Sequence, residues 1–333
     1  MTHSKISGFW PVVAALAGNL FVTTIKFVGF FLSGSGALFS EAVHSLADTA
    51  NQGLLLIGIR RSTKKATDEF AYGYGNERFF WALISACGIF FLGAGVTIYK
   101  GVDSLIHQQE AHISPIIFAI LLISLIIESA TFLIALKEIR KSGHGIAKSL
   151  EEADPSSVAV LYEDGVAVLG IFVAFISIVL TELTGHAYWD AIGSILIGIL
   201  LGVVAIILIS KNHEYLMGKA IPEDLKEAVL KILSTEPAIE KVIDFKSSVL
   251  DFGKYRIKCE IEFNGHALMK SMYREGELKE EFEYVQNDYD EFVRFCADYI
   301  DRVPRLIGSK IDQIEKKIQQ TVPEIIHVDI EIN

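Results

Sequence analysis

The sequence predicts an α-helical membrane protein with six transmembrane helices, followed by a C-terminal α+β cytoplasmic domain. Of its 333 residues, 51% are hydrophobic without counting glycine, more than the roughly 45–50% that soluble domains hold when glycine is counted, and the mean hydropathy is +0.40. Charge is unevenly distributed: residues 1–211 hold 13 Lys and Arg against 16 Asp and Glu, whereas residues 212–333 hold 17 against 25. We therefore expect a membrane domain over 1–211 and an acidic soluble domain over 212–333.

Six apolar windows are long enough to cross about 30 Å of hydrocarbon, which takes about 20 helical residues. They are residues 9–32, 36–59, 79–102, 113–136, 157–182 and 187–210. Basic residues gather in the second-to-third and fourth-to-fifth connections, namely Arg60, Arg61, Lys64, Lys65, Arg78, Lys137, Arg140, Lys141 and Lys148. The third-to-fourth connection instead carries Asp103, His107, Glu110 and His112, and residues 181–186 have no Lys or Arg. Because basic loops stay cytoplasmic, both termini are expected in the cytoplasm.

The acidic domain alternates helical and strand patterns. A helix is expected to begin after Pro222, because proline favours the first turn, and to run to about Leu233. Alternation of apolar and polar residues predicts two strands joined by a turn at 251–253, and a closing strand. The expected strands are Val242–Leu250, Tyr255–Phe263 and Ile325–Ile332, and two further helices are expected over Phe282–Arg302 and Lys310–Thr321.

The cysteines and the N-terminal residues indicate the redox compartment of the chain and the nature of its first apolar segment. Cys87, Cys259 and Cys296 are far apart and form no CxxC pair, which argues against a disulfide framework and suits a reducing compartment. Lys5 precedes a long apolar stretch without a small-residue cleavage site, so we expect a first span rather than a signal peptide. An acidic soluble domain gives no reason to expect nucleic acid.

The second window contains the most informative residues. His44 and Asp48 are four apart, so on a helix both side chains point to one face, and Glu41 lies near that face too. An ionisable group at bilayer depth costs at least a few kcal/mol, and such groups mark ion or proton routes. Imidazole and carboxylate ligands suit zinc or a related divalent ion, and metal and protons compete for them because the ligands must be deprotonated. The alternative for Glu41 is an ion pair with Lys26.

Other polar residues inside the windows have several interpretations. Lys26 either pairs with Glu41 or snorkels to the membrane surface. Glu128 could act as a gate, proton carrier, ligand or interhelical bond. Glu163 and Asp164 are adjacent, so their side chains point about 100° apart, and Asp164 is the first choice as ligand. Asp190, near the start of the sixth helix, is interpreted as an N-terminal cap.

Three segments resemble one known family. The first runs from Ser33 to Asp48 as SGSGALFSEAVHSLAD, followed by Asn51, and looks like the second-helix signature of the cation diffusion facilitators. The segments 72–78 (YGYGNER) and 189–198 (WDAIGSILIG) are similar to the family's entries to the third and sixth helices. The resemblance covers essentially the whole chain. It implies a homodimeric exporter of divalent cations, usually zinc, that exchanges them for protons by alternating access, with no prosthetic group.

The resemblance also implies a metal site made of His44, Asp48 and two residues four apart in the fifth helix. Asp164 fits the second fifth-helix position, but Val160 stands at the first and cannot ligate. The chain looks like the branch with an adjacent Glu-Asp pair there and a fourth-helix glutamate. The fourth ligand is therefore Glu163, Glu128 or water, and manganese, iron, cobalt and nickel remain alternatives to zinc.

For the tail, the resemblance implies a ferredoxin-like βαββαβ domain that dimerises and often binds regulatory metal. The candidate tail ligands are His213, Cys259, His266 and His327. The implied location is a bilayer, expected to be the bacterial inner membrane. Two other functional classes are alternatives: an intramembrane metalloenzyme, which the sequence disfavours because it shows no HExxH-type helix and no evident nucleophile, and a metal-sensing scaffold without transport. We expect a transporter and no enzymatic activity.

Overall fold

The computed structural model describes residues 9–107, 115–140, 155–274 and 276–333. The chain divides into two compact units, Met1–Met217 and Gly218–Asn333, and each is described by itself. Four residues named in the loop predictions, Glu110, His112, Lys141 and Lys148, lie outside the described residues.

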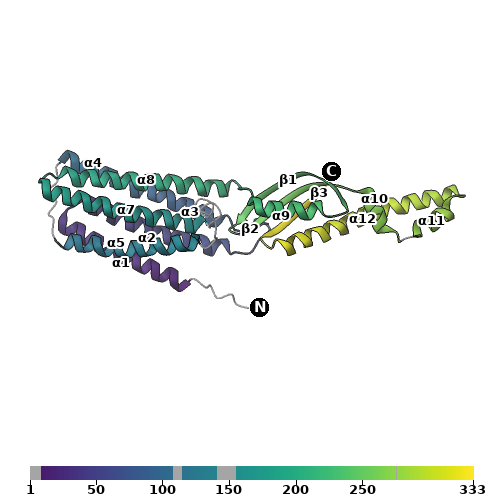
Figure 1. Cartoon of the computed structure of the whole chain (residues 1–333), viewed down its shortest axis with the longest axis horizontal. Helices are drawn as coiled ribbons and strands as arrows, with labels where there is room; N and C mark the ends of the chain where they lie inside the picture. Colours follow the sequence, from purple (N-terminus) through teal and green to yellow (C-terminus); the bar gives the residue numbers. More distant parts are fainter. Residues whose placement is uncertain (1–8, 108–114, 141–154, 275) are drawn as a thin grey trace. The chain divides into compact units, whose positions relative to one another are not determined.

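The first unit is a bundle of long helices that run side by side (Figure 1). Its elements are α1 (Phe9–Ser33), α2 (Gly36–Ser62), α3 (Glu77–Gly88), η1 (Ile89–Gly95), α4 (Val96–His107), α5 (Pro115–Ile139), α7 (Pro155–Thr184) and α8 (Tyr188–Leu216). The third predicted window is thus one helical rod whose middle, η1, is a π-helical turn. Each of the six predicted windows falls on a helix.

Four helical stretches are long and apolar enough to cross a membrane: Glu77–His107, Pro115–Lys137, Val158–Thr184 and Tyr188–Leu216. Gly18–Ser33 is a shorter apolar helix. The helix α2 does not reach that hydropathy, because it carries Glu41, His44 and Asp48 in its first half and two arginines in its last turn. The chain is therefore a membrane protein by its apolar helices, and the count of six spans stays a prediction.

Small residues allow the helices of this bundle to approach closely. A Cβ added to Gly198 of α8 would lie 3.1 Å from the backbone nitrogen of Ile98 in α4. At Gly101 of α4, an added Cβ would lie 3.1 Å from the carbonyl oxygen of Ala191 in α8. Glycine at close helix crossings is the usual device of membrane bundles, since backbones then pack without intervening side chains.

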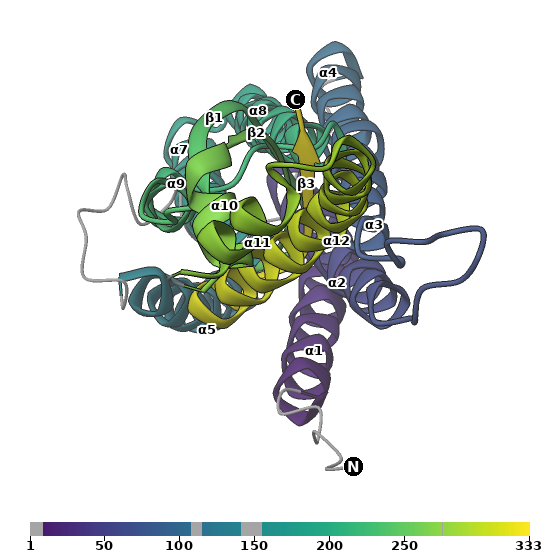
Figure 2. The ribbon, with the colours of Figure 1, turned by 90° about the vertical axis from the view of Figure 1, so that its right-hand side faces the viewer.

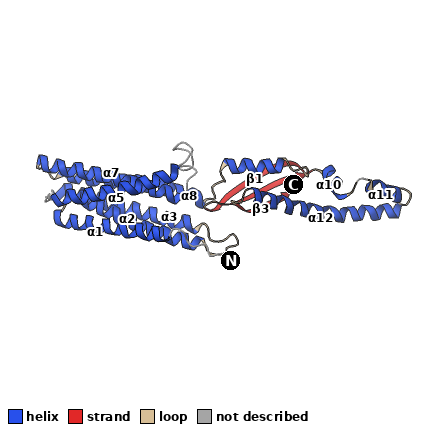
Figure 3. Ribbon diagram, turned by 60° about the horizontal axis from the view of Figure 1, so that its bottom comes forward, coloured by secondary structure: helices blue, strands red, loops and turns tan. Residues whose placement is uncertain are grey.

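The second unit is a small sheet covered by helices. Its elements are α9 (Glu223–Ser234), β1 (Ile239–Asp251), β2 (Lys254–Phe263), α10 (Gly265–Met272), α11 (Glu277–Val285), α12 (Tyr289–Thr321) and β3 (Ile325–Ile332). The strand order is β1-β2-β3, with β1 antiparallel and β3 parallel to β2. Figure 3 shows the strands of this sheet in red. The three predicted strands are confirmed, and the boundaries of the closing strand agree at both ends.

One face of this sheet is buried and the other is charged. Ile257, Cys259 and Ile261 alternate inward along β2 and pack against Leu233 of α9 and Ile318 of α12. The strand β3 runs beside α12 (Figure 2). On the outer face, the β2 cations pair with β3 carboxylates: Arg256 with Asp329 and Lys258 with Glu331.

Two expectations for this unit were wrong in detail. The sheet has three strands in the described residues, one fewer than the βαββαβ pattern, and β3 therefore pairs directly with β2. The helical stretch expected over Phe282–Arg302 is interrupted instead, since Asp288 caps a new helix by accepting bonds from the backbone nitrogens of Asp290 and Glu291. That helix, α12, then continues through Pro304 to Thr321, so the break expected between two helices lies earlier.

Candidate metal-transport site

The pair His44 and Asp48 lies buried on one face of α2. Ser35 starts this helix by accepting a hydrogen bond from the backbone nitrogen of Leu38, 3.2 Å away. The Nε2 of His44 is 3.6 Å from Oδ2 of Asp48, and their side chains are 2% and 9% exposed. Two ligands of a tetrahedral zinc ion, at bonds of about 2.0–2.1 Å, stand about 3.3 Å apart. The two atoms are therefore separated by close to the distance that one shared ion requires.

Three of the four ligand atoms of this pair lack a hydrogen-bond partner in the part of the chain that the structure describes. Among the described residues, neither ring nitrogen of His44 nor Oδ1 of Asp48 has a hydrogen-bond partner. Buried polar atoms in proteins are normally bonded, so an unbonded set at one place needs an explanation. Imidazole nitrogen and carboxylate oxygen are the donor types that first-row divalent ions accept.

Carboxylates from two other helices lie near Asp48. Glu163 and Asp164 of α7 and Glu128 of α5 are its electrostatic neighbours, and all three are buried. Asp164 bonds to Thr131 of α5, and its Oδ2 has no partner among the described residues. No three His, Cys, Asp or Glu side chains in the described parts stand close enough to hold one ion. Val160 lies half-buried one turn before Asp164.

The carboxylate of Glu163 is held by an amide. The Nδ2 of Asn51 donates to both oxygens of Glu163 at 2.5 Å, and the Oδ1 of Asn51 accepts a bond from the hydroxyl of Ser85. Glu163 and Asp164 thus bond to different helices, as their angular separation predicts. The roles of Asn51 and Ser85 were not anticipated. Asn51 is three residues after Asp48, so its place on the same face of α2 was the available signal.

Lys26 of α1 is fully buried, which corrects the expectation that it could snorkel. Its Nζ donates to Oε2 of Glu41 at 3.1 Å and to the hydroxyl of Ser45 at 2.8 Å, and it lies 3.6 Å from Oε1 of Glu128. The ion pair between Glu41 and Lys26 is therefore present. The carboxylates compensate the ammonium where water cannot, which is why it stays inside the bundle.

Asp190 caps a helix other than its own, which corrects its interpretation as the cap of α8. Its carboxylate accepts bonds from the hydroxyl of Ser35 and the backbone nitrogen of Gly36, both at 2.5 Å, and from the backbone nitrogen of Ala37 at 3.3 Å. These donors form the N-terminus of α2, which favours negative charge. Asp190 thereby ties α8 to the helix that carries His44.

The three candidate tail ligands of the second unit, Cys259, His266 and His327, do not converge. Cys259 is buried within the apolar core, and this burial raises the pKa of its thiol to about 12. His327 pairs with Arg256 in the register of β2 and β3, so its side chain lies on the opposite face of the sheet from Cys259. His266 is exposed on α10, and His213 belongs to the first unit.

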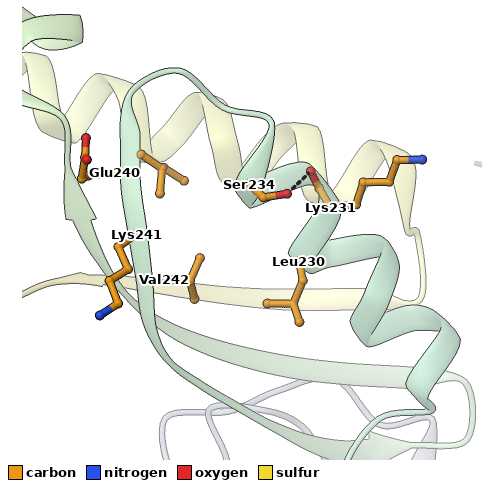
Figure 4. A pocket seen from close by; sticks show the side chains of 7 residues that line it. Leu230, Lys231, Ser234, Glu240, Lys241 and Val242 are labelled. Carbon is orange, nitrogen blue, oxygen red and sulfur yellow. Dashed lines mark hydrogen bonds between the residues drawn. The ribbon is translucent and has the colours of Figure 1, made fainter.

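The second unit has a hollow of about 420 Å³ between the end of α9 and the start of β1. Figure 4 shows Leu230, Lys231 and Ser234 on one side and Glu240, Lys241 and Val242 on the other. This lining contains neither His nor Cys and only one carboxylate, so the hollow lacks the ligands of a transition metal.

Comparison with known proteins identifies the family of this chain. Residues 12–217 match the family model described as the cation efflux transmembrane domain. The chain is 34% identical over 328 residues to the proton-coupled zinc antiporter SLC30A9, mitochondrial, of Mus musculus and of Homo sapiens, covering 96% of this chain and 58% of each relative. It therefore spans less than two thirds of their length.

Two further relatives extend the comparison. Metal tolerance protein C4 of Arabidopsis thaliana is 38% identical over 330 residues, covering 96% of this chain and 72% of that protein. Magnetosome protein MamB of Magnetospirillum gryphiswaldense is 24% identical over 231 residues, covering 68% and 73% respectively. The names of the mouse and human relatives place those proteins in mitochondria and lend no support to a bacterial inner membrane. The chain belongs to the cation efflux family of transporters, the cation diffusion facilitators that its second helix resembles, and not to a family of enzymes.

Proposed function

We propose that this chain exports a divalent transition-metal cation, zinc in the first place, across a membrane in exchange for protons. The observation that carries the proposal is a buried group of five carboxylates with one ammonium, Lys26, and one histidine beside them. With all carboxylates ionised, this group has a formal charge of −4. Besides Lys26, its members are Glu41, His44, Asp48, Glu128, Glu163 and Asp164.

Such a charge is stable in a low-dielectric interior only when cations or protons balance it. A divalent ion bound to His44 and Asp48 requires both ligands to be deprotonated, so each arriving ion displaces protons and each proton competes with the ion. This competition supplies the exchange. The printed names of the mouse and human relatives, as proton-coupled zinc antiporters, support the same ion and the same coupling.

We assign the ligand core to His44, Asp48 and Asp164. The unbonded Oδ2 of Asp164 and its electrostatic interaction with Asp48 support its inclusion, and the three side chains must move closer together to hold one ion. Glu163 and Glu128 act as auxiliary or proton-linked groups, since Asn51 and Lys26 already engage them.

The proposal includes six spans, with α1 and α2 completing the four clearly apolar stretches. Both termini lie on the side of the basic loops, from which the ion is exported. We further propose a homodimer in which residues 218–333 help join the two copies.

The test is zinc-driven proton movement in liposomes that contain the purified chain. His44→Ala and Asp48→Ala should each abolish the flux, because each removes half of the closest ligand pair. His107→Ala is the matched control, since His107 is exposed at the end of α4 and pairs with Asp103. Wild-type flux in both site variants would refute the assignment of the ligands, and no zinc-dependent flux in the wild type would refute the function.

Asp164→Asn and Glu163→Gln separate the two α7 carboxylates. Asp164→Asn should lower zinc flux at least about tenfold, as loss of a direct ligand or its close support does. Glu163→Gln should keep zinc binding, because an amide still accepts the bond from Asn51. The reverse order of effects would place Glu163 in the core instead of Asp164.

A further inference from the structure

The contacts of Lys26 resemble those of a bound cation. Its ammonium has three N–H donors, and three oxygen-bearing side chains surround it: Glu41 at 3.1 Å, Ser45 at 2.8 Å and Glu128 at 3.6 Å. The side chains of Lys26 and Glu41 are 0% exposed and that of Glu128 is 5% exposed. The ammonium is a compact point charge, so it fills the centre of this set much as a small ion would.

The oxygen set adjoins the proposed transport pair. Glu41, Ser45 and Asp48 lie on one face of α2 at successive turns, with His44 beside them. Lys26 also interacts electrostatically with Asp48. The second carboxylate oxygen of Glu41 points at Gly170 of α7, where any side chain would collide with it. The chain thus provides an oxygen-lined position next to a nitrogen-containing one.

The two positions differ in the ions that they favour. Sites made only of carboxylate and hydroxyl oxygens suit Mn²⁺ and other oxygen-preferring ions, whereas imidazole suits Zn²⁺. Without a resident positive charge, Glu41 and Glu128 would be two additional hard ligands within reach of the path past Asp48. The lysine removes both from competition by binding them itself.

We infer that Lys26 is a specificity-determining residue: a tethered cation that occupies an oxygen-lined site beside the transport pair and prevents Glu41 and Glu128 from becoming metal ligands. The transport consequence rests on the proposed export function, but the binding consequence does not. Loss of the ammonium opens a site for Mn²⁺, and the preference for Zn²⁺ over Mn²⁺ falls.

The test measures Mn²⁺ binding to the full chain in detergent by electron paramagnetic resonance, in which free Mn²⁺ gives a signal that binding removes. Lys26→Gln should bind Mn²⁺ at least about tenfold more tightly than the wild type, because the amide preserves one hydrogen bond and withdraws the charge. Lys26→Arg should behave as the wild type. The triple variant with Glu41→Gln and Glu128→Gln should lose the gain.

Two results would overturn the inference: folded Lys26→Gln without tighter Mn²⁺ binding, or a gain that persists in the triple variant. Should Lys26→Gln fail to fold, Lys26→Gln with Glu41→Gln carries the same test, since it leaves one freed carboxylate, Glu128, beside Asp48. Its Mn²⁺ affinity must still exceed that of the wild type. Absent zinc flux in wild-type liposomes would refute the export function and leave this binding result to be judged separately.

Discussion

Replacing Asp190 should destabilise the membrane unit through the helix that carries His44. In Asp190→Ala, two short bonds to a charged acceptor are lost, one from the Ser35 hydroxyl and one from the Gly36 nitrogen, both at 2.5 Å. Bonds to charged groups are worth about 2 kcal/mol each, so the expected loss is about 4 kcal/mol. The longer bond from Ala37 at 3.3 Å adds little. Asp190→Asn keeps a neutral acceptor for these bonds, so its loss in free energy of unfolding should be roughly half as large.

The assay is thermal unfolding of the purified chain in detergent, followed by tryptophan fluorescence. At about 2–4 °C per kcal/mol for a unit of this size, Asp190→Ala should lower the Tm by roughly 8–16 °C. The matched control is Asp103→Ala, because Asp103 is partly exposed and its surface pairs with Lys100 and His107 are worth at most about 1 kcal/mol each. If Asp190→Ala melts within the range of that control, the cross-helix cap does not hold α2, and the reasoning fails.

Two further predictions concern buried groups. Burial raises the pKa of Cys259 from 9.0 to about 12, so the stabilisation from its neutral thiol is complete below about pH 9 and is lost as the pH rises towards 12. The loss in free energy of unfolding is up to about 1.4 kcal/mol per pH unit. In urea unfolding, the stabilities of the wild type and of Cys259→Ala should converge over that range, and parallel pH profiles of the two proteins would contradict this prediction. Gly170→Ala should displace the Glu41 carboxylate from Lys26 and lower the free energy of unfolding by about 1–3 kcal/mol, measured by thermal unfolding. The control Gly88→Ala should cause no such loss, because the space around Gly88 is open. Equal melting temperatures of the two variants would contradict a collision between the added methyl group and Glu41.

The elements that follow from local sequence were the most predictable. The start of α2 at Gly36 follows from Ser35, whose hydroxyl accepts from the backbone nitrogen three residues on. The strand β3 alternates inward Val328 and Ile330 with outward polar residues, so its boundaries agreed with the pattern. The π-helical turn η1 was not foreseen, because nothing in a continuous apolar run distinguishes it from an α-helix.

The site was predictable where its residues share one helix and much less so where they come from several. His44 and Asp48 follow from their spacing alone. The partners of Lys26, Asp190 and Glu163 depend on which helices pack together. The polar residues of one window do not indicate which other window will lie beside it. The interpretation of Asp190 as the cap of its own helix was wrong for this reason: the nearest unbonded backbone nitrogens in space belong to a helix about 150 residues earlier in the chain.

The link between Lys26 and Glu41 has a consequence for how the chain enters a bilayer during synthesis. A charged side chain near the middle of a lone helix costs roughly 3 kcal/mol on insertion scales, and α2 alone is not apolar enough to offset its own carboxylates. Lys26 and Glu41 are only 15 residues apart across the tight turn between α1 and α2. Their side chains can therefore pair and neutralise each other's charge while the chain is being synthesised. We therefore expect α1 and α2 to integrate as one hairpin, and a nascent chain that ends before Glu41 to be retained poorly.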